Sequence, residues 1–93
     1  MDTNDIDPSD LERLDAEIAL SRRMAAFHDG EDAYLAEAYE RDAEDLQDLR
    51  DTIARGDLAE AGRLANSLET YVREEIPRGL YRTLMQAAGL LDG

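Results

Sequence analysis

Nearly all the side chains of this sequence that could bind or react are carboxylates. Its 93 residues include 23 aspartate and glutamate residues against ten bases, all of them arginine, and the formal net charge is −13. At about 100° per residue, five of the acids fall within about ±40° of one line, so that a helix would present them as a single row. These five acids are Glu37, Glu40, Glu44, Asp48 and Asp51.

The negative charge is concentrated in the first half of the chain. Residues 1–51 hold 17 acids and five arginines, whereas residues 52–93 hold six acids and five arginines. A strongly acidic half attracts a basic partner and repels nucleic acid itself. The alternative is that the charge only keeps a small protein soluble or reflects a salt-adapted proteome, although a salt-adapted chain would be acidic throughout.

The sequence contains no recognisable motif for catalysis or for binding a metal or cofactor. His28 is the single histidine, and its position in a helix-ending turn favours a solvated or capping imidazole. Cysteine is absent, which excludes disulfides and thiolate metal sites. We therefore expect no enzyme activity, no cofactor and no metal. The acidic first twenty residues do not resemble a signal peptide, and no apolar run could span a membrane, so we expect a cytoplasmic protein.

The sequence pattern predicts that these acids are carried by the helices of an all-α protein. Ser9 with Glu12 forms a capping box that opens a helix ending near Phe27, and Gly30 suits the left-handed cap. Further helices are expected over residues 31–54, 57–76 and 78–90, and Asp57 caps the second of these three. The expected organisation is a flexible acidic tail, residues 1–8, followed by one domain, residues 9–93, folded as a small bundle of three to four antiparallel helices.

The predicted helix over residues 31–54 has a core face opposite its acidic row. That face is formed by Leu35, Tyr39, Leu46, Leu49 and Ile53. Asp42 lies on the same apolar stripe, where a buried carboxylate would need an arginine partner. We expect Asp42 to lie at a helix crossing that is open to water.

The first predicted helix is apolar on two faces. Leu11, Leu14, Ile18 and Ala25 form one stripe, and a second set points nearly the opposite way. The second set is Leu20, Met24 and Phe27. Either this helix lies centrally in the bundle, or its second face meets another subunit. We favour a homodimer, because so short a chain has little core to wrap a central helix.

The acidic row has the linear charge density of a nucleic-acid strand. Residues 37–51 span about 21 Å of helix, over which one strand offers about six phosphates. Acids of the first helix, Asp15 and Glu17 among them, extend this surface. The row could therefore occupy a groove of arginine and lysine residues built for DNA or RNA, and the expected partner is a basic nucleic-acid-binding protein or complex.

In size, acidity and lack of catalytic residues, the whole chain resembles the small phage and mobile-element proteins that mimic nucleic acid, anti-CRISPR proteins among them. The resemblance rests on composition, because those proteins share no motif. It implies a protein that blocks a CRISPR effector or another nucleic-acid-binding complex, without assigning any residue.

A second resemblance is local and carries an alternative function. Residues 46–49, 52–57 and 63–68 resemble the histidine phosphotransfer domain, a four-helix bundle with an exposed phosphorylated histidine. Asn66 stands in place of that histidine, and its amide nitrogen is not a usable nucleophile, so this resemblance implies a regulatory adaptor without phosphotransfer. A small structural or assembly subunit of a phage-like particle is the remaining alternative.

Overall fold

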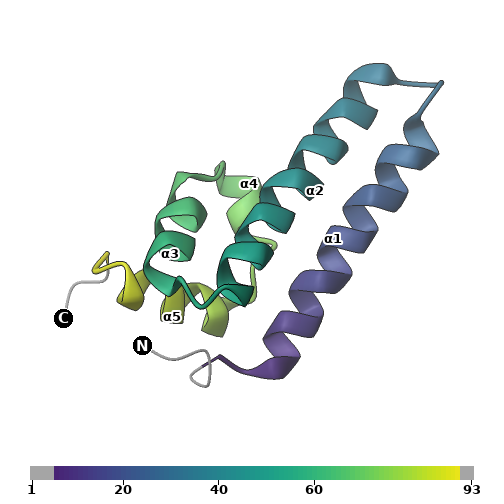
Figure 1. Cartoon of the computed structure of the whole chain (residues 1–93). Coiled ribbons are helices and arrows are strands. Elements are labelled where there is room, and N and C mark those ends of the chain that lie inside the picture. Colours follow the sequence, from purple (N-terminus) through teal and green to yellow (C-terminus); the bar gives the residue numbers. More distant parts are fainter. Residues whose placement is uncertain (1–5, 91–93) are drawn as a thin grey trace.

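The computed structural model describes residues 6–90, and helices are the only regular elements in that part of the chain. The helices are α1 (Pro8–His28), α2 (Ala33–Ala54), α3 (Leu58–Ser67), α4 (Thr70–Arg73) and α5 (Arg78–Ala87) (Figure 1). The predicted all-α class is confirmed. The finer prediction of three or four antiparallel helices is not confirmed, because two long helices are joined here to three short ones.

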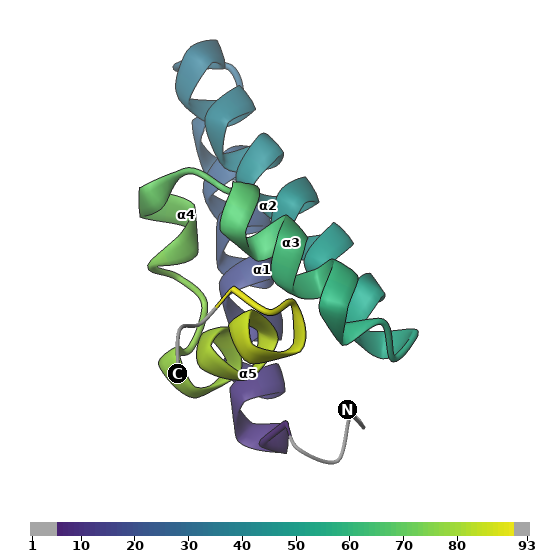
Figure 2. The same cartoon turned by 90° about the vertical axis from the view of Figure 1, so that its left-hand side faces the viewer.

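The two long helices form a hairpin against which the short helices gather. α1 and α2 run antiparallel side by side, and α3, α4 and α5 lie beside only part of them (Figures 1 and 2). The molecule is elongated, with principal extents of 46, 23 and 19 Å. The turn between α1 and α2 projects beyond the short helices (Figure 1). We call residues 20–41 the distal hairpin.

The hydrophobic core lies where the base of the hairpin meets the short helices. The largest fully buried side chains are Leu14, Leu46, Leu49, Ile53, Val72, Leu80 and Leu84. Each fully buried leucine contributes about 1.5–3 kcal/mol relative to an exposed one. The two members of the α2 stripe in the distal hairpin, Leu35 and Tyr39, are only half-buried. The core therefore covers the C-terminal half of the stripe and leaves the rest partly open.

The start of α1 differs from the predicted capping box. The helix begins at Pro8, and the Asp7 carboxylate accepts a hydrogen bond from the Ser9 backbone N–H at 2.9 Å. Proline suits the first helical position, because its missing N–H would have no partner there. Ile6 is 4 % exposed, so residues 6–8 belong to the folded unit rather than to a tail. The rest of the predicted tail lies outside the described residues.

The other helix boundaries follow local capping signals. Gly30 has a φ of 93°, the left-handed conformation that the sequence predicts. α2 begins two residues later than predicted, because Asp32 is its cap and accepts from the Leu35 N–H at 3.1 Å. Asp57 caps α3 as predicted, accepting from the Glu60 N–H at 3.2 Å.

The predicted single helix over residues 57–76 is wrong. α3 ends at Ser67, Leu68 and Glu69 are extended with ψ values of 153° and 150°, and the short α4 follows. This turn redirects the chain so that Val72 and Ile76 become 2 % and 4 % exposed. The burial of Val72 and Ile76 thus favours this turn over a continuous helix through residue 76.

A glycine sets the closest approach of α3 to α5. Gly62 is buried on α3, and a Cβ built there would clash with the Leu84 carbonyl oxygen and would lie 2.7 Å from the Ala88 Cβ. Backbone atoms cannot rotate away as a flexible side chain can. The two helices therefore pack at this distance only because residue 62 has no side chain.

We expect Gly62→Ala to lower the free energy of unfolding by about 1–3 kcal/mol, since α3 and α5 must move apart. Urea denaturation followed by circular dichroism measures the change. Gly79→Ala is the matched control, because a Cβ there meets only the end of a side chain, the Asp10 carboxylate, at 3.0 Å. The control should gain helix propensity and be neutral or slightly stabilised. Equal effects of the two substitutions would contradict the proposed close approach.

Candidate interaction surface on the helical hairpin

The acidic row of α2 lies in solvent along its whole length. All five of its members, Glu37, Glu40, Glu44, Asp48 and Asp51, are exposed. The ion pairs among residues 6–90 join Arg50 to Asp15 and Arg63 to Glu60, and neither involves the row. The row therefore presents carboxylate charge that no arginine of the described residues neutralises by direct contact.

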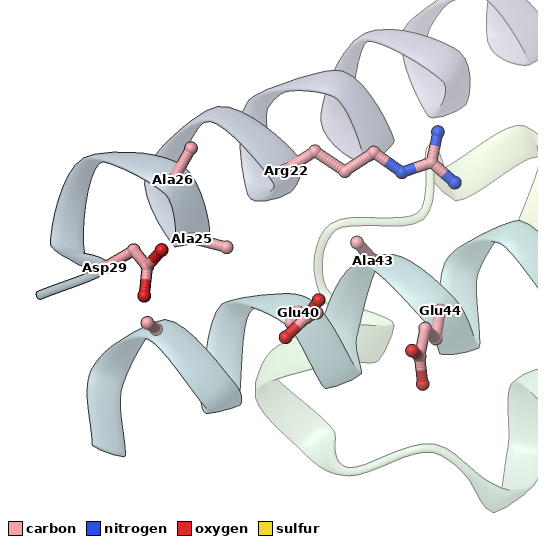
Figure 3. A pocket seen from close by; sticks show the side chains of 8 residues that line it. Arg22, Ala25, Ala26, Asp29, Glu40, Ala43 and Glu44 are labelled. Atoms are coloured by element: carbon pink, nitrogen blue, oxygen red, sulfur yellow. The ribbon is translucent and has the colours of Figure 1, made fainter. Parts of the chain in front are cut away.

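Two members of the row form the rim of a groove between α1 and α2. The groove has a volume of about 510 Å³ and is lined by alanines of both helices, by Glu40 and Glu44, and by Arg22 and Asp29 (Figure 3). Its alanines are Ala25, Ala26, Ala36 and Ala43. Because alanine is short, the helices leave an open channel here with carboxylates beside it.

Arg22 is held away from the carboxylates of the groove by an amide. Its Nη2 donates to Gln47 Oε1 at 2.9 Å, and Gln47 Nε2 donates in turn to Asp51 Oδ1 at 2.9 Å. The glutamine thus links the guanidinium to the last acid of the row. Among the described residues, Glu40 and Glu44 have no such partner.

The two predicted contact residues on α1 lie in different surroundings. Asp15 accepts from Arg50 Nε at 3.0 Å, which ties it to α2, and an exposed pair of this kind contributes at most about 1 kcal/mol. Glu17 lies away from the row and lines a hollow together with Arg13, Glu74 and Glu75. The structure therefore links Asp15, but not Glu17, to the helix that carries the row.

Asp42 contradicts the expectation of a water-exposed carboxylate. Its exposed fraction is only 7 %, and its nearest hydrogen-bond donor is the Tyr71 hydroxyl of α4, at 3.5 Å. Burial and the charge of Asp45 raise the pKa of Asp42, and the hydrogen bond from Tyr71 opposes them only in part. The missing arginine partner makes this carboxylate a destabilising element of the fold.

Asp42 belongs to a wider group of carboxylates crowded between helices. Burial, then Asp48 and Glu44, raise the pKa of Asp45. Burial, then Glu17 and Asp42, raise the pKa of Glu75, whose Oε2 is buried without a hydrogen-bond partner in the described structure. Sequence reasoning missed Asp45 and Glu75, although the position of Asp42 on the apolar stripe was the one available signal.

The predicted subunit-contact residues lie on an open face of α1. Leu20 is 44 % and Phe27 is 71 % exposed, and Met24 is half-buried. α1 lies at the edge of the molecule against α2 (Figure 1), so the alternative of a central helix is wrong. His28 ends α1 half-buried, with its ring stacked on Tyr39 at a centroid distance of 5.8 Å rather than solvated in the turn.

Other kinds of site find no support in the described part of the chain. Residues 6–90 contain no group of three or more histidine, aspartate or glutamate side chains placed to hold a metal ion. Within the same residues, no helix is both long and apolar enough to cross a membrane. Asn66 is exposed near the end of α3, which stops one residue later.

Comparison with family models, curated proteins and solved structures finds no match.

We expect Asp42→Asn to raise the free energy of unfolding at neutral pH by about 1 kcal/mol, since the amide keeps an acceptor for Tyr71 and removes a buried charge. Thermal or urea unfolding measures the change. Asp48→Asn, at an exposed position of the same helix, is the control and should change stability by less than about 0.5 kcal/mol. Loss of stability in Asp42→Asn would show that the ionised carboxylate is needed.

We also expect the protein to become less stable as the pH rises from the ordinary carboxyl range, about 4, through the raised pKa values of its enclosed carboxylates. The pKa values of Asp42, Asp45 and Glu75 are raised in the folded state, so the folded chain binds more protons than the unfolded chain over this range. The stabilisation is complete below the unfolded pKa, near about 4, and is lost as the pH passes the folded values. Melting temperatures in matched buffers measure it, and a melting temperature that increases with pH would contradict the assignment.

Proposed function

We propose that this protein is a non-catalytic acidic interaction protein that occupies a basic nucleic-acid-binding surface of another protein or complex. The observation that carries the proposal is the row of five exposed carboxylates on α2, none of which forms an ion pair within the described residues. The five carboxylates lie along one face of one helix, so a linear array of basic residues could meet all of them together.

The spacing of the row suits a site built for phosphates. The row extends over about 21 Å at 1.5 Å per residue, the length of about six phosphates of one strand. An α-helix fixes these positions before binding, so little conformational entropy is lost when a partner docks. Association should be fast, because long-range attraction steers a basic surface toward it.

The groove beside the row supports an arginine or lysine as the contacting residue. The methylene groups of either side chain can lie on the alanine lining while the charged head group reaches Glu40 or Glu44. Arginine fits best, because its planar guanidinium pairs with a carboxylate through two hydrogen bonds. Both residues abound on surfaces that bind DNA or RNA.

The compositional resemblance to anti-CRISPR proteins places a CRISPR effector first among the partners to be tested. The proposal itself requires only a basic nucleic-acid-binding surface. Direct binding of DNA or RNA is not part of it, since a net charge of −13 repels phosphate.

We expect Glu40→Arg with Glu44→Arg to weaken partner binding at least about tenfold, because two attractive contacts become repulsive. Immobilised protein first captures partners at low salt from nuclease-treated bacterial lysate, and fluorescence anisotropy then measures the affinity of each purified partner. Circular dichroism checks that the variant remains helical.

The matched control is Glu12→Arg with Glu74→Arg, which makes the same change in net charge at exposed positions outside the row. The control should retain most of the affinity, and excess duplex DNA or RNA should displace the wild-type protein from its partner. Equal loss in both variants would assign the effect to net charge alone. A partner that holds this protein and nucleic acid together would overturn the proposal.

A further inference from the structure

The segment that joins α3 to α5 has little regular structure of its own. It contains the four-residue α4, and neither the start of α4 nor the start of α5 has a side-chain cap. The connections on both sides of α4 are not helical, with ψ values of 153° at Leu68, 150° at Glu69 and 137° at Pro77. We call residues 68–77 the strap, whose α4 lies to one side of α3 and α5 (Figure 2).

The strap is held on the hairpin mainly by apolar burial. Val72 and Ile76 are 2 % and 4 % exposed and belong to the hydrophobic core. Among residues 6–90, the one hydrogen bond from the strap to the hairpin is donated by the Tyr71 hydroxyl to Asp42 Oδ1, at 3.5 Å. Neither ion pair of those residues includes the strap. Polar contacts therefore do little to hold it in place.

Asp42 of α2 is enclosed where the strap meets the hairpin. It is 7 % exposed, and the strap brings the Glu69 carboxylate and the Tyr71 hydroxyl toward it. On α2 its charged neighbours are Asp45 and Arg41. Burial and then Asp45 raise the pKa of Asp42, and the Tyr71 hydrogen bond and Arg41 offset them only in part. The ionised form of Asp42 is therefore disfavoured while the strap is seated.

Glu75 is the carboxylate that the strap itself brings to this contact. Its Oε2 is buried without a hydrogen-bond partner in the described structure. Burial, then Glu17 of α1 and Asp42 of α2, raise the pKa of Glu75. The other charged groups that line the hollow beside it are Asp10 and Arg13 of α1, Glu74 of the strap and Arg78 of α5. Neither arginine pairs with Glu75, so its ionisation places an uncompensated charge in the contact.

We propose that the strap responds to pH: it is seated on the hairpin while Asp42 and Glu75 carry their protons, and it detaches locally when both are ionised. Local detachment leaves the rest of the fold in place, because α3 and α5 touch each other directly at Gly62 and need not separate. Detachment returns the two carboxylates to water and exposes Val72 and Ile76. At higher pH the protein therefore presents an apolar surface that is covered at lower pH.

The direction follows from linkage between proton binding and seating. The pKa values of Asp42 and Glu75 are raised in the seated state, so the seated strap binds more protons than the detached one. Seating is favoured fully below the ordinary carboxyl pKa, about 4, and is weakened as the pH rises through the raised values. Neither residue belongs to the acidic row, so the inference does not depend on the proposed function.

The test is amide hydrogen exchange of the full chain, measured by mass spectrometry in a series from about pH 5 to about pH 8 and expressed as protection factors. We expect residues 70–76 to be less protected than residues 46–53 at every pH, and their protection to fall at least about tenfold across the series. The protection of residues 70–76 should also be insensitive to about 1 M urea, because local detachment exposes little surface. Global unfolding, by contrast, would make both segments sensitive to urea.

The decisive variant is Asp42→Asn with Glu75→Gln, which removes both titrating groups and keeps an acceptor for the Tyr71 hydroxyl. Its strap should stay protected across the whole series. The matched control is Glu40→Gln with Glu74→Gln, which removes the same charge at exposed positions of α2 and the strap and should behave as the wild type. Circular dichroism checks that all the proteins remain helical.

Four results would each overturn the inference. The first is strap protection that does not change with pH, and the second is strap protection that matches residues 46–53 and falls with urea as theirs does. The third is a pH-dependent fall that persists in the Asp42→Asn, Glu75→Gln variant. The fourth is a control variant whose strap stays protected as fully as that of the decisive variant, which would assign the effect to net charge.

Discussion

The apolar stripe of α2 runs the length of the helix, but the short helices cover only the half nearest to α3. Where they cover it, leucine and isoleucine side chains are sealed from water, as at Leu46 and Ile53, which are 0 % and 1 % exposed. Beyond that region α1 and α2 rest on each other through small side chains and one pair of stacked rings. This uneven coverage makes one end of the molecule a packed core and the other a projecting two-helix arm.

The arrangement of charge follows from the same packing. Carboxylates are costly to bury without a partner, so most acids of α2 occupy the side that faces water. At the edge of the region that the short helices cover, the apolar and acidic faces of α2 adjoin. Asp42 is enclosed there, with only a long hydrogen bond from Tyr71. The molecule therefore combines a rigid exposed row of anions with a few enclosed carboxylates whose pKa values are raised for the same physical reason, the loss of water.

Features set by local sequence could be predicted, and features set by long-range packing could not. The two long helices, the left-handed Gly30, the Asp57 cap and the solvent exposure of the row all follow from spacing along one helix or turn. The end of α3 at Ser67 and the enclosure of Asp42 depend on where the short helices dock, which no local pattern encodes. The position of Glu17 away from the row has the same origin. Helical spacing tells which face of α1 carries Glu17, but not which element lies beside that face.

The central claim is that the anionic row takes the place of a nucleic-acid strand on its partner, and one titration tests it most directly. The association constant for the purified partner should be measured calorimetrically at several salt concentrations, from about 50 to about 200 mM, with and without saturating duplex DNA or RNA. The account predicts that affinity falls steadily as salt rises and that binding disappears when nucleic acid fills the site. An association constant that is independent of salt, or undiminished by bound nucleic acid, would contradict it.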